Sequence, residues 1–219
     1  MLNSNNLFYF VFQSTFVMSN EEYLKDITEI KSLMNKSSRF ISLSGLSGIL
    51  AGIYALIGAA IAYYLVYNSP RGYLILDGTI FRICAAILIA VAILSIITGI
   101  FLTTQKAKKN GEKVWESSSK RLLINFLIPL ITGGLYILII LNQERYGHTA
   151  ALMLIFYGLA LINASKYSLG DIRYLGYTEI ILGLICAFMP AYGFWFWVLG
   201  FGIMHILYGT WMHFKYDLK

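Results

Sequence analysis

The sequence has too little charge to cover a water-soluble globule. Only 13% of its 219 residues are charged and 58% are apolar, whereas an average soluble domain has about 25% charged residues. Proline and cysteine are also scarce, with 3 and 2 residues. This composition excludes an intrinsically disordered chain, a disulfide-rich scaffold and a soluble enzyme. The mean hydropathy of +0.68 and the 16% of aromatic residues instead indicate an integral membrane protein.

Motifs for metal, cofactor or nucleophilic chemistry are missing from the sequence. Cys84 and Cys186 lie in apolar runs, and neither belongs to a C-x-x-C pair. The three histidines, His148, His205 and His213, do not have the spacing of metal ligands. There is no G-x-S-x-G, H-E-x-x-H, phosphate-binding or dinucleotide-binding motif. We therefore expect no metal, no cofactor and no enzymatic activity.

The net charge of +6 does not by itself indicate a nucleic-acid-binding protein. Basic loops on the cytoplasmic side of a membrane protein produce the same excess, and no nucleic-acid-binding motif accompanies it. We therefore expect the lipid bilayer to be a partner and nucleic acid not to be a direct one.

Six apolar segments approach the roughly 20 residues that cross a hydrocarbon core of about 30 Å. A spanning segment must satisfy its own backbone hydrogen bonds, so all six should be helices. The sequence thus predicts an all-α fold, with a six-helix transmembrane bundle over residues 39–219. In chain order the predicted spans are 41–67, 80–104, 122–141, 149–165, 174–189 and 194–214.

Lysine and arginine are divided unequally between the two sides of this predicted bundle. Fourteen fall on the side that carries both termini, and six of these follow the second span, between Lys106 and Arg121. Only Arg71, Arg82 and Arg145 fall on the other side. The positive-inside rule therefore predicts a multi-pass inner-membrane protein with both termini in the cytoplasm.

The residues before the first span form two segments. Leu7–Val17 is apolar but too short to span a bilayer, and it lacks the flanks of a signal peptide. Residues 1–17 are either an over-extended start, with Met18 as the natural first residue, or a weak interfacial anchor. Residues 18–38 open with the capping box of Ser19 and Glu22 and predict a cytoplasmic amphipathic helix. That helix either lies on the inner leaflet or its own loops, or docks a soluble partner or a second copy.

Two ionisable residues lie inside predicted spans and are the best candidates for an intramembrane polar site. At about 1.5 Å per residue, Glu179 in the fifth span is about 8 Å deep and His205 in the sixth about 13 Å deep. The two spans form a hairpin, so these side chains can meet, with Tyr208 one turn away. A charge at the membrane centre costs on the order of 3 kcal/mol, so such groups are usually paired. The pair is either a proton or ligand site or a structural clip between two helices.

Small residues form a stripe along the first span, which includes a G-x-x-x-G motif: Gly48, Gly52, Ala55 and Ala59. Such a stripe lets two helix backbones approach closely inside a membrane. Packing within the bundle and formation of a homo-oligomer explain it equally well.

Three stretches of the sequence together resemble a known group of proteins. They are RFISLSGLSG (39–48), RLLINFLIPLITGG (121–134) and KYSLGDIRYLG (166–176), the last of which is followed by Glu179. They resemble a group of uncharacterised six-span inner-membrane proteins of Bacteroidota-type bacteria, over nearly the whole chain from Met18 onward. The resemblance implies a small winged-helix regulator as a soluble partner, and it implies no catalytic activity.

These observations predict a non-enzymatic membrane scaffold or sensory subunit. It would present its amphipathic helix and its basic loop to a soluble cytoplasmic regulator. The alternative is a small-solute or proton-coupled transporter that uses Glu179 and His205.

Overall fold

The computed structural model describes residues 23–28, 43–68, 78–111 and 114–217. The chain divides into two compact units, Met1–Ser38 and Arg39–Lys219. In the first unit, residues 23–28 are helical. The rest of the predicted amphipathic helix over 18–38, and all of residues 1–17, lie outside the described residues.

Every regular element in the described part of the second unit is helical. The first helices are α3 (Gly45–Tyr67), α4 (Thr79–Lys109), α5 (Ser117–Asn142), α6 (Thr149–Ser165) and α7 (Ile172–Phe188). The C-terminal helix, Pro190–Asp217, is continuous but irregular. It consists of a 3-10 turn (Pro190–Tyr192), α8 (Gly193–Trp197), a π-helical segment (Val198–Met204), α9 (His205–Met212) and a π-helical turn (His213–Asp217).

Four of the described helices are long and apolar enough to cross a membrane: α3, α4, α5 and the C-terminal helix. The apolar helix α6 and the helix α7 have 17 residues each, which corresponds to about 25 Å. The described part of the chain is therefore all-helical, with four candidate membrane-spanning helices.

The predicted spans and the observed helices agree in place. Helix α6 has the predicted bounds 149–165, whereas the other helices differ from their predicted spans in length. Helix α4 continues to Lys109 instead of ending at residue 104, and α5 begins at Ser117 instead of residue 122. A hydropathy pattern stops where the apolar residues stop, whereas the helical hydrogen bonds continue through polar residues. Three lysines in the last turn of α4 also interact favourably with the negative end of its dipole.

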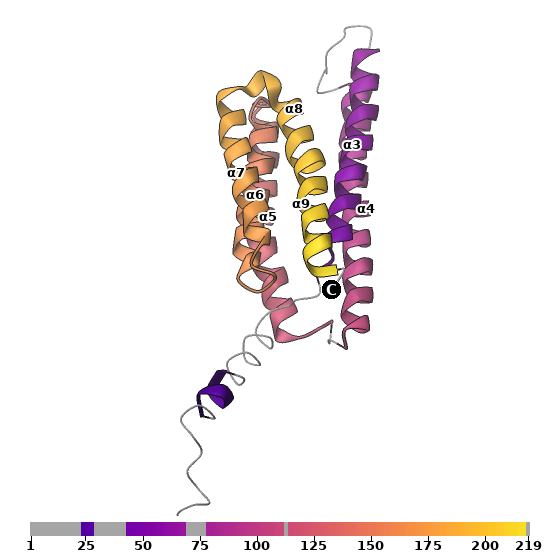
Figure 1. Ribbon diagram of the computed structural model, residues 1–219. Helices are drawn as coiled ribbons and strands as arrows, with labels where there is room; N and C mark the ends of the chain where they lie inside the picture. The colour runs from indigo at the N-terminus through magenta and orange to yellow at the C-terminus, as the bar shows by residue number, and fades with distance from the viewer. Residues whose placement is uncertain (1–22, 29–42, 69–77, 112–113, 218–219) are drawn as a thin grey trace, which may run out of the picture. The chain divides into compact units, whose positions relative to one another are not determined.

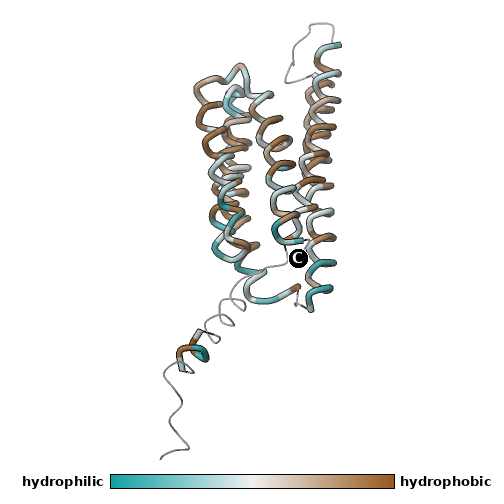
Figure 2. The backbone as a smooth tube through the Cα atoms, viewed as in Figure 1, coloured by the Kyte–Doolittle hydropathy of each residue, from teal (hydrophilic) through white to brown (hydrophobic). Residues whose placement is uncertain are grey.

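The C-terminal helix lies between two groups of helices in the second unit. On one side α3 packs against α4, and on the other α6 packs against both α5 and α7. Within the C-terminal helix, α8 packs against α6 and α7, whereas α9 packs against α3 (Figure 1). Figure 2 shows hydrophobic residues along the helices and hydrophilic residues at the helix ends near the C-terminus.

Helix α3 and the C-terminal helix approach closely because glycines lie on both sides of the contact. A Cβ at Gly52 would lie 2.6 Å from the carbonyl oxygen of Gly202, and one at Gly48 would lie 3.2 Å from the Cα of Gly209. Close backbone packing of this kind supplies dispersion energy where lipid removes the hydrophobic drive. The other small residues of the predicted stripe are also buried within this unit: Ala55 and Ala59.

A proline inside α5 is compensated by a side chain from α6. Pro129 has no N–H, so the carbonyl of Asn125, four residues earlier, loses its helical hydrogen bond. The side-chain amide of Asn163 in α6 donates to that carbonyl oxygen at 3.0 Å. This interhelical bond thus fixes α6 against α5 at the point where the helix lacks its own donor.

Candidate intramembrane polar site

His205 lies at the start of α9, directly after the π-helical segment, and is 6% exposed. Its Nδ1 lies 2.9 Å from the carbonyl oxygen of Gly200, within that segment. Because a carbonyl oxygen can only accept, Nδ1 carries the hydrogen and donates it. The irregular helix therefore presents a backbone acceptor to its own histidine and fixes the tautomer of the ring.

The other ring nitrogen of His205 contacts Tyr157 of α6. The Tyr157 hydroxyl lies 2.8 Å from Nε2, and the two rings are stacked with their centroids 5.3 Å apart. With the hydrogen on Nδ1, Nε2 of the neutral ring accepts the bond that Tyr157 donates. This contact ties α6 to the C-terminal helix.

Glu179 of α7 completes the cluster but makes no close hydrogen bond. Its side chain is fully buried, and its Oε1 lies 3.5 Å from Nδ1 of His205. That nitrogen is already bonded to the nearer Gly200 carbonyl, and in the described part of the chain neither carboxyl oxygen has a hydrogen-bond partner. Gly200 also makes room for the carboxyl group, since a Cβ there would lie 2.5 Å from Oε2.

The structure brings Glu179 and His205 together. The tyrosine that contacts His205 is Tyr157, whereas the sequence predicted Tyr208 as the third member of the cluster. The Tyr208 hydroxyl is buried and has no hydrogen-bond partner among the described residues. Tyr157 is a tyrosine in the middle of an apolar 17-residue helix. A buried phenol usually needs a partner, and this was the signal in the sequence that could have identified it.

A largely apolar cavity of about 530 Å³ lies beside this cluster. Tyr157, His205 and Tyr208 are part of its wall. All helices of the second unit contribute to it, and representative lining residues are Ala55, Gly99, Gly134, Met153, Leu175 and Phe201. At one end it reaches Leu43 and Ser44, which precede α3.

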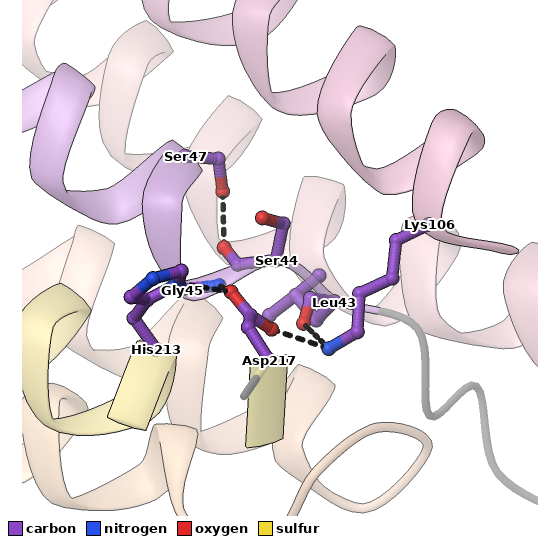
Figure 3. A network of polar contacts seen from close by, with 7 residues as sticks. All are labelled: Leu43, Ser44, Gly45, Ser47, Lys106, His213 and Asp217. Atoms are coloured by element: carbon purple, nitrogen blue, oxygen red, sulfur yellow. Dashed lines mark hydrogen bonds and ion pairs between the residues drawn. The ribbon is translucent and has the colours of Figure 1, made fainter. Parts of the chain in front are cut away.

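At that end of the bundle, Asp217 connects the beginning of α3, the end of α4 and the C-terminal helix (Figure 3). Its carboxylate accepts hydrogen bonds from Lys106 Nζ at 2.6 Å and from the Gly45 N–H at 3.0 Å. It also contacts His213 Nδ1 at 2.8 Å, and Lys106 donates to the Leu43 carbonyl. A carboxylate at the start of a helix also stabilises the helix dipole.

A second ion pair joins the C-terminal helix to the connection between α6 and α7. Asp171 accepts hydrogen bonds from Lys215 Nζ and from the Tyr216 hydroxyl. Burial acts to raise the pKa of the Asp171 carboxyl, but these two bonds and the lysine charge outweigh it and hold the pKa below its ordinary value. These contacts thus link four segments at one end of the bundle: the beginning of α3, the end of α4, the α6–α7 connection and the end of the C-terminal helix.

Within the described ranges, no three histidine, cysteine, aspartate or glutamate side chains gather in a way that could hold a metal ion. Comparison with protein-family models, with curated proteins and with solved structures gives no match to this chain.

Proposed function

We propose that the chain is a six-span inner-membrane protein with both termini in the cytoplasm. The ion pairs of Asp217 and Asp171 and the hydrogen bond from the Gly45 N–H to Asp217 support this arrangement. Together these contacts join four segments that the positive-inside count assigns to one side. If these four segments lie on the same side of the membrane, the chain forms three helical hairpins that each cross the membrane and return to that side. The hairpins are α3 with α4, α5 with α6, and α7 with the C-terminal helix. The 17-residue helices α6 and α7 are short but within the range of spanning helices.

Within this bundle, we propose a non-enzymatic scaffold or sensory role, in which the cytoplasmic side binds a soluble regulator. The observation that carries the proposal is the apolar surrounding of the polar cluster. Glu179 is fully buried, and the cavity beside its neighbour His205 is largely apolar, so a polar solute would find few partners there. The bond between Tyr157 and His205 then serves to hold α6 and the C-terminal helix together.

Co-purification from native membranes in a mild detergent tests the partner. The tagged wild-type chain should retain one soluble protein in stoichiometric amount. Replacing the exposed lysines at the end of α4, Lys108→Glu with Lys109→Glu, or the exposed Ile27→Asp in the N-terminal unit, should release it. The matched control is Arg145→Glu on the predicted opposite side, which should retain the partner. A wild-type chain that carries no soluble protein would contradict the proposal.

A second candidate function, proton-coupled transport, is favoured by one observation. Glu179 is a fully buried carboxyl group without a hydrogen-bond partner among the described residues, and a histidine nitrogen lies 3.5 Å away. Ionisable groups within membranes often carry protons in transporters. The arrangement provides a group that could bind and release a proton.

Stability and proton flux distinguish the two functions. Glu179→Met removes an unpartnered carboxyl group, so the melting temperature in detergent should stay the same or rise. Under the scaffold proposal, proteoliposomes of the wild type and of this variant should both show no proton flux under an imposed potassium diffusion potential. A flux in the wild type that Glu179→Met or His205→Leu abolishes would establish transport instead.

A further inference from the structure

The cavity in the bundle has the size and lining of a ligand site. Its volume of about 530 Å³ lies within the roughly 300–1,000 Å³ that is common for small-molecule sites. Along α3 it extends from Gly45 to Ala55, which corresponds to about 15 Å of helix. The cavity is therefore elongated along the helices and ends near Leu43.

The arrangement of α4 and α5 opens this cavity toward the surrounding lipid. Among the described helices, α4 packs closely only against α3, and α5 packs closely only against α6. Both helices nevertheless line the cavity, so it is bounded by two helices that do not close upon each other. Only Ala107 is buried on α4.

An empty apolar cavity at this depth would be unfavourable. Its walls would lose dispersion contacts, and water does not fill an apolar cavity readily. The abundant apolar molecules around a membrane bundle are acyl chains, which can enter such a space without leaving water. An elongated, laterally accessible and apolar cavity thus fits a single acyl chain.

Positively charged side chains near one end of the cavity favour a lipid with an anionic headgroup. The last turn of α4 contains three lysines, Lys106, Lys108 and Lys109. Lys106 donates a hydrogen bond to the carbonyl oxygen of Leu43, and Leu43 lines the cavity. Basic side chains next to a membrane attract anionic headgroups. Lys106 is held by Asp217, whereas the side chains of Lys108 and Lys109 are exposed.

We propose that this cavity holds one acyl chain of an anionic phospholipid, whose headgroup lies on the basic last turn of α4. The proposal rests on the membrane position of the helices given under the proposed function. It does not depend on the soluble regulator, and its test measures lipid alone.

Two glycines allow the cavity to be filled without a clash. A Cβ at Gly99 of α4 or at Gly134 of α5 would meet no atom within 4 Å, and both residues line the cavity. Gly99→Phe and Gly134→Phe therefore place a ring in the space from two different helices. The matched control is Ile100→Phe, which adds a ring on α4 at a side chain that is 63% exposed and outside the cavity lining.

Native mass spectrometry of the purified full chain, equilibrated with mixed phosphatidylglycerol and phosphatidylcholine micelles, measures the bound lipid. We expect one retained phosphatidylglycerol in the wild type and in Ile100→Phe, and about tenfold less in Gly99→Phe and Gly134→Phe. Lys108→Gln with Lys109→Gln should still retain a lipid but lose the preference for phosphatidylglycerol. Circular dichroism and gel filtration show which variants are folded, and the two filling variants provide independent tests.

Equal lipid retention by a folded filling variant and the wild type would overturn the assignment of the cavity. Equal retention of the two phospholipids by the wild type would overturn the assignment of the headgroup. If no soluble protein co-purifies but lipid retention behaves as expected, the scaffold proposal is contradicted and the lipid site is still supported.

Discussion

Two tyrosines on the cavity wall, Tyr157 and Tyr208, differ in whether their hydroxyl groups form a hydrogen bond. Comparing them tests what the bond to His205 contributes to stability. The Tyr157 hydroxyl bonds Nε2 of His205, while the buried Tyr208 hydroxyl has no partner within the described residues. Removing Tyr157's hydroxyl leaves the ring nitrogen unsatisfied, whereas removing Tyr208's hydroxyl removes an unsatisfied group. The same chemical change at two sites on the cavity wall thus has opposite consequences for hydrogen bonding.

We predict that Tyr157→Phe destabilises the folded protein by about 1–3 kcal/mol, because it strands a buried acceptor. Tyr208→Phe should be neutral or slightly stabilising. Thermal unfolding of the two variants in the same detergent, followed by circular dichroism, measures the difference. Equal losses in both would show that the bond between Tyr157 and His205 does not stabilise the fold.

The sequence predicted part of this cluster for a clear physical reason. Glu179 and His205 stand out because ionisable groups are costly in apolar helices. Tyr157 was missed because its role depends on which face of α6 meets the C-terminal helix, and spacing within one helix does not determine that. The π-helical segment that places the Gly200 carbonyl against His205 was missed too, since it depends on packing against α3 and α7.

At the scale of single helices, the bond between Asn163 and the Asn125 carbonyl explains how α5 tolerates a proline. The bond replaces the hydrogen bond that Pro129 cannot make. The compensation comes from a different helix, so proline and asparagine form a coupled pair. Changes at the two positions should therefore not be additive.

We predict that Asn163→Leu alone costs about 1 kcal/mol of stability, because it leaves the Asn125 carbonyl without a donor. Adding Pro129→Ala restores the backbone N–H and should recover most of that loss. Unfolding of the two single variants and the double variant in detergent gives the coupling energy. If the losses simply add, the amide of Asn163 is not the replacement donor.

The ion pair of Asp171 gives a pH-dependent contact between the C-terminal helix and the α6–α7 connection. Its folded-state pKa is depressed, so the carboxylate stabilises the fold above its ordinary value of 3.8. The contribution is lost as the pH falls through the lower, folded-state pKa.

We therefore predict that Asp171→Asn melts below the wild type at pH 7, and that this difference shrinks as the pH falls below 3.8. The difference at pH 7 should be small, because Lys215 is 42% exposed and solvent screens the pair. Asp26→Asn, which makes the same change at an exposed aspartate, is the control and should show no such trend. A difference that is independent of pH would mean that the charge of Asp171 is not involved.

For the whole molecule, hydropathy was enough to predict a helical fold. Each predicted span overlaps a described helix, and four of these helices are long and apolar enough to cross a membrane. The reason is that a bilayer imposes one secondary structure on an apolar segment. Which helices pack together was not predictable, because the apolar faces look alike in sequence. Glycine contacts between α3 and the C-terminal helix allow these two helices to pack closely. From the sequence alone, the glycine stripe of α3 fitted a contact within the bundle and a contact between two copies equally well.

The structure also adds a constraint to the predicted orientation. Lys106, Asp171, Lys215 and Asp217 lie in ion pairs that connect segments far apart in the chain. Segments joined in this way must lie on the same side of the bilayer. The positive-inside rule predicts that this side is the cytoplasm, because the sequence count assigns most of the basic residues to it.

We predict this orientation for a chain in which Cys84 and Cys186 are replaced by alanine and one new cysteine is introduced. Cysteines at Lys108 or Lys166 should react with a membrane-impermeant maleimide only after spheroplasts are lysed. Cysteines at His148 or Tyr192, both exposed on the predicted outer side, should react in intact spheroplasts. The labelled fraction is read on a gel as a mass shift. Labelling of Lys166→Cys before lysis would place the α6–α7 connection outside, and the ion pair between Asp171 and Lys215 would then place the C-terminus there as well.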